Sequence, residues 1–232
     1  MTSVALALTL LGAMASVVAA VAVAGSGAEA QVPGLATSAI AWSAGVMVAF
    51  GASLRAVHLD REEGVASLVR ARGGSVGAYV AGRVGGLVVV LAASLGGASL
   101  VAGAAATSFA RPVGPALVAT LAAVAYACTF AVTIGPLAMA ALGARTRVGG
   151  YLTLLAVLAL PEVLAPWTAG LLPRGWHELT SVPAALAAVR AGVASPSTMA
   201  APMARALAAL AAVVAVSLLV VVARVRWAEP ER

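Results

Sequence analysis

Long apolar runs separated by short polar connections are the main pattern of this sequence. A helix needs roughly 20 apolar residues to cross about 30 Å of hydrocarbon. Six runs reach that length, so the pattern predicts an all-α, polytopic membrane protein with one transmembrane domain over residues 1–232. The predicted spans are Val4–Ala24, Leu35–Leu54, Val84–Ala106, Ala116–Leu142, Tyr151–Leu171 and Ala206–Val222.

The first run has an alternative interpretation as a secretory signal. Ala28-Glu29-Ala30 before Gln31 resembles a signal-peptidase site. A signal peptide, however, has a basic n-region and a short apolar region. No basic residue precedes Arg55 and the apolar run is too long, so a retained span is favoured, with cleavage left as the alternative.

Leu59–Gly74 is the one long charged segment, and it predicts a short amphipathic helix. Asp60 is placed to cap its first turn, with Glu63 completing a capping box. Gly73 and Gly74 would supply a left-handed stop. On a helix, Glu63, Ser67 and Arg70 share one face and Val65, Leu68 and Val69 share the opposite one. Such a helix would lie on a membrane surface; the alternative is a solvated loop.

Composition agrees with a membrane protein and excludes several other classes. Apolar residues form 62% of the chain and charged residues 9%, and the mean hydropathy is +1.06. All 14 basic residues are arginines, which lie between apolar runs and form no patch interleaved with aromatic residues, so no nucleic-acid partner is expected. The single Cys128 and two distant histidines have no metal-ligand spacing, and no cofactor is expected.

Arginine distribution predicts the orientation of the spans. Ten arginines lie on one side of the predicted membrane: Arg55, Arg61, Arg70, Arg72, Arg83, Arg145, Arg147, Arg224, Arg226 and Arg232. Four lie on the other: Arg111, Arg174, Arg190 and Arg205. The positive-inside rule then places both termini and Leu59–Gly74 in the cytoplasm of a bacterium, with the protein in the inner membrane.

Smaller signals refine the spans. Ala93/Gly97 and Ser99/Gly103 are pairs of small residues that would allow close helix approach. Gly135-Pro136 predicts a kink in the fourth run, and Pro161 and Pro166 predict breaks in the fifth. The weakly amphipathic stretch Val182–Val193, marked by Ser181 and Pro183 at its start and Gly192 near its end, predicts a short helix that lies in or dips into the outer leaflet.

Candidate chemistry is sparse. There is no nucleophilic triad, HExxH motif or phosphate-binding loop, so the chain is not expected to be an enzyme. Glu162 is the only acidic residue in a predicted span, where a carboxylate is either functional or placed near a wet cavity or interface by the break at Pro161. His177 beside Trp176 is either an axial haem ligand or an interfacial aromatic pair.

The pattern resembles the membrane subunit of a type-2 ABC exporter. The features are six spans, cytoplasmic termini, and the acidic-Gly stretch Asp60-Arg61-Glu62-Glu63-Gly64 directly after the second span. Within that superfamily the chain is most similar to the permease of the haem exporter of cytochrome c maturation. The passage TIGPLAMAALGARTRVGGYLTLLAVLALPEVLAP, with its basic turn, Gly pair and LPxxxxP helix, adds to that likeness.

The resemblance implies a transport mechanism shared between chains. A coupling helix over residues 60–72 would dock on a cytoplasmic ABC ATPase through Asp60, Glu62, Glu63, Gly64, Ser67 and Arg70. A second permease subunit, identical or not, would complete a dimer. A haem-handling membrane subunit would supply any haem ligands, since His177 is alone.

The sequence also fits other functions. One is an ABC permease for a lipid, glycan, peptide or drug-like substrate. Another is a non-transporting assembly subunit, which would need no coupling helix. A third is an autonomous secondary transporter, which would need more intramembrane polar residues than Glu162. Co-purification of an ATPase separates the ABC hypotheses from the other two.

Overall fold

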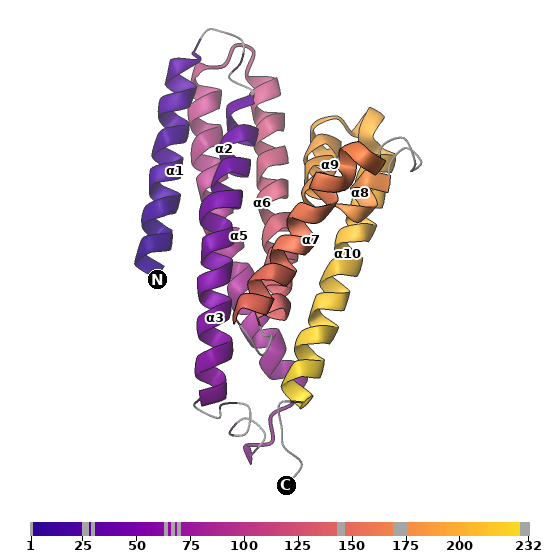
Figure 1. Ribbon diagram of the computed structural model, residues 1–232. Helices are drawn as coiled ribbons and strands as arrows, with labels where there is room; N and C mark the ends of the chain where they lie inside the picture. The colour runs from indigo at the N-terminus through magenta and orange to yellow at the C-terminus, as the bar shows by residue number, and fades with distance from the viewer. Residues whose placement is uncertain are drawn as a thin grey trace.

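The computed structural model describes residues 2–24, 28, 31–62, 65, 68, 71–142, 147–168 and 176–227. Throughout these residues the secondary structure is helical, with turns and no strand, which confirms the all-α prediction. The elements, shown in Figure 1, are α1 (Thr2–Ala22), α2 (Val32–Ile40), the π-helical turn η2 (Ala41–Gly45), α3 (Val46–Glu62), α5 (Val76–Phe109), α6 (Val113–Leu142), α7 (Arg147–Thr168), α8 (Trp176–Thr180), α9 (Val182–Ala194) and α10 (Pro196–Trp227).

Five helical stretches within the described residues are long and apolar enough to cross a membrane. They are Val32–Leu54, Val76–Phe109, Val113–Leu142, Val148–Trp167 and Pro196–Val225. They correspond to the second through sixth predicted spans and give the chain the architecture of a multi-pass membrane protein. The first run forms the 21-residue helix α1, in which Gly12–Ala22 is a shorter apolar helix, so a sixth span stays a prediction.

Successive long helices run in opposite directions (Figure 1). The C-terminal ends of α3, α6 and α10 point to one end of the bundle, here called the charged end, which is the lower end in Figure 1. The turn between α5 and α6 and the short helices α8 and α9 lie at the other end, here called the α9 end. The C-terminal ends of α3, α6 and α10, which we predict on one side of the membrane, therefore lie at one end of the molecule.

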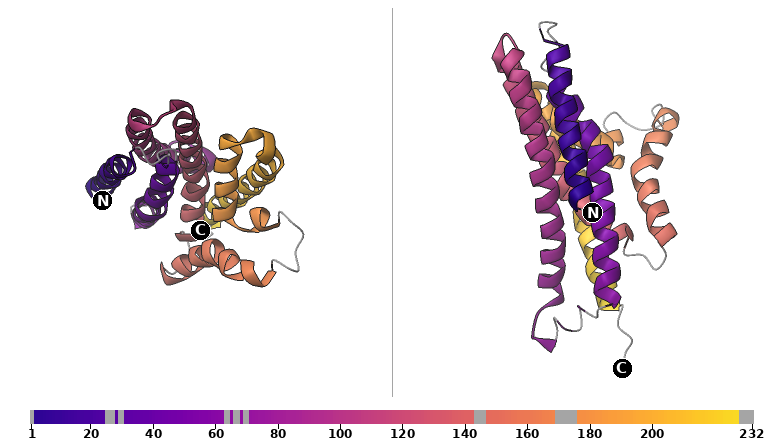
Figure 2. Two further views of the ribbon diagram at one scale, coloured as in Figure 1. Left: turned by 90° about the horizontal axis from the view of Figure 1, so that it is seen from above. Right: turned by 90° about the vertical axis from the view of Figure 1, so that its left-hand side faces the viewer.

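Helix α6 is the centre of the packing. It contacts α2, α3, α5, α7, α9 and α10, and its residues from Thr133 to Leu142 are all buried. Viewed along the bundle, α1, α2–α3 and α5 lie on one side of α6 and α9–α10 on another, while α7 is peripheral (Figure 2, left). Only 11% of the α7 span is buried inside the chain, so most of its apolar surface faces outward.

One predicted small-residue pair makes a close helix contact and the other does not. Ser99 and Gly103 of α5 are buried, and a Cβ on Gly103 would overlap the Thr120 side chain of α6. Ala93 and Gly97 are exposed, and nothing lies within 4 Å of where a Gly97 Cβ would be. The prediction is therefore correct for Ser99/Gly103 and wrong for Ala93/Gly97, which lie on the outer face of α5.

The predicted breaks at Pro161 and Pro166 are wrong. Helix α7 is continuous from Arg147 to Thr168 with both prolines inside it. Each proline removes one backbone donor, but a spanning helix tolerates this where its remaining backbone groups are satisfied nearby. Helix α6 also continues through Pro136, and the kink predicted there stays a prediction.

The predicted start of the amphipathic helix at Asp60 is wrong. Helix α3 continues through Asp60 to Glu62, so Asp60 lies in the last turn of that helix and does not cap a new one. The stretch from Arg55 to Glu62 contains no glycine or proline that would stop a helix. The stop predicted at Gly73 is confirmed, because this residue has a φ of 76°. Ser75 then caps α5 through the Ala78 amide.

Candidate functional site

At the charged end, few of the predicted coupling residues can be placed. The backbone of Asp60 and Glu62 is helical, within α3. Glu63, Gly64, Ser67 and Arg70 lie outside the described residues. Val65 and Leu68 are helical, and the amide of Arg72 donates to the Leu68 carbonyl, as in a helical turn that leads to Gly73. The docking face that we predict from Glu63, Ser67 and Arg70 stays a prediction.

At the α9 end, the predicted short helix is present as α9, Val182–Ala194. The Ser181 hydroxyl caps it by accepting from the Ala184 amide, and Pro183 occupies the first turn. Gly192 does not end the helix as the sequence pattern suggested. It is buried against α10, where a Cβ would lie 2.6 Å from that of Met203. Helix α9 is therefore packed on α6 and α10 as part of the bundle.

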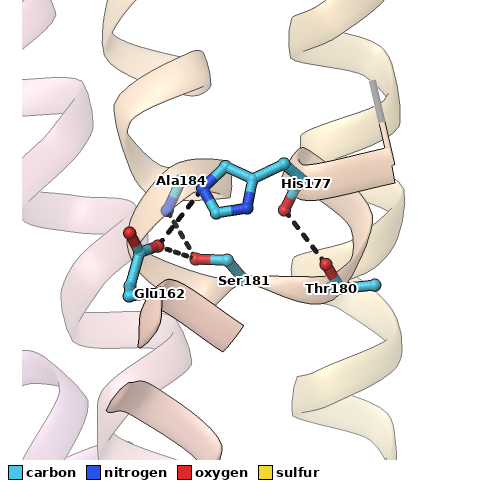
Figure 3. Close-up of polar contacts among 5 residues, drawn as sticks. All are labelled: Glu162, His177, Thr180, Ser181 and Ala184. Atoms are coloured by element: carbon cyan, nitrogen blue, oxygen red, sulfur yellow. Dashed lines mark hydrogen bonds and ion pairs between the residues drawn. The ribbon is translucent and has the colours of Figure 1, made fainter. Parts of the chain in front are cut away.

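Glu162 contacts residues of the connection that carries α8 and α9 (Figure 3). The Ser181 hydroxyl donates to Glu162 Oε1, and His177 Nε2 lies 3.5 Å from the same oxygen. The Glu162 side chain is 42% exposed. Glu162 lies within the Val148–Trp167 span, and Ser181 and His177 provide the polar partners that a carboxylate in such a span needs.

The three side chains do not form a nucleophilic triad. In a triad the serine hydroxyl donates to the histidine, which in turn donates to the carboxylate. Here both Ser181 and His177 face one carboxylate oxygen of Glu162 (Figure 3). Ser181 also serves as the α9 cap, so the arrangement ties α7 to the start of α9.

His177 lies in the first turn of the short helix α8. It is 44% exposed, and its carbonyl accepts from the Ser181 amide at 3.0 Å. The backbone of Trp176 begins α8, and its side chain lies outside the described residues. The described part of the chain contains no group of three or more His, Cys, Asp or Glu residues able to hold a metal ion.

Two polar bridges at this end were not anticipated from the sequence. Arg205 of α10 pairs with Glu178 of α8 at 3.0 Å. Arg190 of α9 donates to the Gly34 carbonyl of α2 at 2.8 Å, and its guanidinium carbon lies 5.7 Å from the centre of the Tyr126 ring. For the bridge between Arg190 and Gly34 the sequence offered one signal. Arg190 lies in an otherwise apolar stretch, where its charge requires a polar partner.

Comparisons with known proteins add no assignment. No protein-family model, curated protein or solved structure matches this chain.

Proposed function

We propose that this chain is the membrane-spanning permease subunit of an ABC exporter driven by a separate cytoplasmic ATPase. The observation that carries the proposal is the extension of α3. The apolar span ends at Leu54, yet the helix continues through the charged stretch to Glu62 at the charged end. A rigid polar extension of this kind provides a direct mechanical connection between a spanning helix and a protein outside the membrane.

The coupling follows from the energetics of linked equilibria. An ATPase can drive a membrane conformational change only as far as its contacts differ between the two states. Asp60 and Glu62 at the end of α3, with Glu63, Gly64, Ser67 and Arg70 directly after it, are the proposed docking residues. Because ABC ATPases act as pairs, the proposal includes a second permease subunit. The charged end is then cytoplasmic, in agreement with the arginine distribution.

The proposed substrate class comes from the sequence resemblance and is haem, or a reductant, for cytochrome c maturation. The arrangement around His177 favours haem ligands from a partner subunit, because His177 faces Glu162 and the described residues offer no second histidine beside it. In this proposal the chain supplies ATP-driven movement.

Co-purification tests the proposal. The tagged chain, extracted from its native membrane in mild detergent, should retain an ABC ATPase. The Glu63→Ala substitution should reduce both the amount of ATPase retained and its rate of ATP hydrolysis. Glu231→Ala is the matched control, since it removes the same side chain near the C-terminus and should have no effect. Wild-type protein that retains no ATPase would contradict the proposal.

Gene deletion tests the substrate class separately. Loss of covalent c-type cytochromes on haem staining, restored by the wild-type gene but not by Glu63→Ala, would support a role in cytochrome c maturation. If the deletion strain has normal c-type cytochromes while the tagged wild-type chain retains an ATPase, another exported substrate replaces haem in the proposal.

A further inference from the structure

The second spanning stretch is interrupted at its middle by a π-helical turn, η2. The amide of Val46 donates to the carbonyl of Ala41, five residues earlier, which is the defining bond of a π-helix. A turn of this kind contains one residue more than an α-helical turn and leaves a carbonyl without its regular partner. The Ser43 hydroxyl donates to the Ala39 carbonyl at 2.6 Å and so satisfies a backbone group at this point.

The half on the α9 side of this turn is held by polar and steric contacts with three other helices. Thr37 donates to the Ser99 hydroxyl of α5 at 2.9 Å, with both side chains buried. The Gly34 carbonyl accepts from Arg190 of α9. Ile40 packs so closely on α1 that a Cβ at Gly12 would lie 2.6 Å from its Cγ1. Helix α2 is therefore fixed in position.

The half on the charged side of the turn is held differently, by apolar contacts. Ser53 is the only polar side chain from Val46 to Leu54, and its buried hydroxyl has no hydrogen-bond partner among the described residues. Phe50 lies against Tyr151 of α7, with ring centres 5.8 Å apart. Apolar contacts are less directional than hydrogen bonds, so α3 should shift at smaller cost than the hydrogen-bonded α2.

From this contrast we infer that η2 is a hinge, about which α3 and its charged extension move while α2 stays fixed. Hinges are short segments that absorb backbone changes between rigid elements, and π-helical turns concentrate at functional positions. Trp42 within η2 packs edge-on against Phe130 of α6, with ring centres 5.3 Å apart, and holds the pivot against the central helix. The inference deepens the proposed function, because the moving half leads to the proposed docking segment.

The hinge is tested on the isolated chain in lipid nanodiscs, with Cys128 replaced by serine and spin labels on paired cysteines. One pair, Leu35 with Leu207, reports on α2 against α10, and the other, Ala52 with Leu219, reports on α3 against α10. All four positions are exposed, and α2–α3 and α10 lie across α6 from each other. The Ala52–Leu219 distance distribution should be about twice as broad as the Leu35–Leu207 distribution. Equal widths would overturn the hinge.

Deleting Ser43 provides the structural control. Removing one residue from a π-helical turn restores an α-helix and leaves both flanking segments in register, so the protein should fold and the Ala52–Leu219 distribution should narrow. Deleting Met47 instead, within regular α3, rotates the rest of the helix by about 100° and should prevent folding. Ser43→Ala keeps the length of the turn and should leave the Ala52–Leu219 distribution broad. A folded Ser43 deletion that stays as broad as wild type, or intolerance of the Ser43 deletion equal to that of Met47, would refute the inference.

Nucleotide separates the hinge from the proposed function. If an ATPase is bound, ATP should shift the Ala52–Leu219 distribution and leave Leu35–Leu207 unchanged. A broad Ala52–Leu219 distribution without any nucleotide response keeps the hinge and rejects coupling to an ATPase.

Discussion

The contact between Gly103 of α5 and Thr120 of α6 should be the least tolerant of added volume in the bundle. In Gly103→Ala the new Cβ would lie 2.8 Å from Thr120 Cβ and closer still to Thr120 Oγ1 and Cγ2. The Thr120 hydroxyl donates to the Ala116 carbonyl at 2.7 Å, which fixes its rotamer. The threonine must therefore turn and lose that bond, or the two helices must separate.

The magnitude follows from those two alternatives. Losing the hydroxyl bond costs about 1 kcal/mol, and overpacking a well-packed interface costs about 1–3 kcal/mol. For a chain of this size each kcal/mol lowers the melting temperature by about 2–4 °C, so Gly103→Ala should lower it by about 2–12 °C. The melting temperature is read as the loss of monodisperse protein on size exclusion after heating in detergent.

Two controls make the result specific. Gly97→Ala, on the exposed face of the same helix, adds the same methyl group where nothing lies within 4 Å, and should leave the melting temperature unchanged or raise it. Thr120→Ala in the Gly103→Ala background removes the two atoms that overlap most and should recover part of the loss. Equal melting temperatures for Gly103→Ala and Gly97→Ala would refute the proposed packing of α5 on α6.

Four further outcomes are expected. Ser181→Ala removes the α9 cap and the bond to Glu162, so backbone amides at the start of α9 should exchange faster with deuterium, by a factor equivalent to about 1 kcal/mol; unchanged exchange would contradict the cap. Gly192→Ala should destabilise the protein by about 1–3 kcal/mol through overlap with Met203, with partial rescue by Met203→Ala; a neutral Gly192→Ala would contradict that contact. Glu178→Gln should change stability by less than about 1 kcal/mol in thermal unfolding, because the pair with Arg205 is partly exposed, and a larger loss would show that it is buried in the membrane-bound protein. In Cys128→Ser protein in intact cells, an impermeant thiol reagent should label a cysteine at Leu179, which is exposed, and not one at Ser67; the reverse pattern would invert the orientation.

Elements whose sequences carry a local signal could be predicted from the sequence. The long apolar runs predicted the second through sixth spans because burial in hydrocarbon needs little beyond length and composition. Helix α9 was predicted from its capping serine and first-turn proline. The stop at Gly73 followed from glycine's access to positive φ.

The errors arise where local preference and tertiary context disagree. Asp60 has the residue type of a helix cap, but the residues before it already belong to a helix that nothing interrupts. Pro161 and Pro166 favour a break only when the freed backbone groups have no other partner. Gly97 and Gly103 are indistinguishable in sequence, and only the position of Thr120 separates them.

The polar bridges could not be predicted because their partners are far apart in sequence. Arg190 and Gly34 are separated by 156 residues, and Glu178 and Arg205 by 27. The π-helical turn at Ala41–Gly45 also has no local signal, because its extra residue fits an apolar sequence as well as a regular turn does.

Site-specific photo-cross-linking tests the central claim, that the charged end of this chain docks on an ATPase. A photoreactive amino acid replaces Ser67 in one variant and Leu179, at the α9 end, in a matched variant. After illumination of native membranes, Ser67 should form a covalent adduct with a protein that carries an ATP-binding domain, and Leu179 should not. An ATPase adduct from Leu179 alone, or none from Ser67 and its neighbours Glu63 and Arg70, would contradict the account.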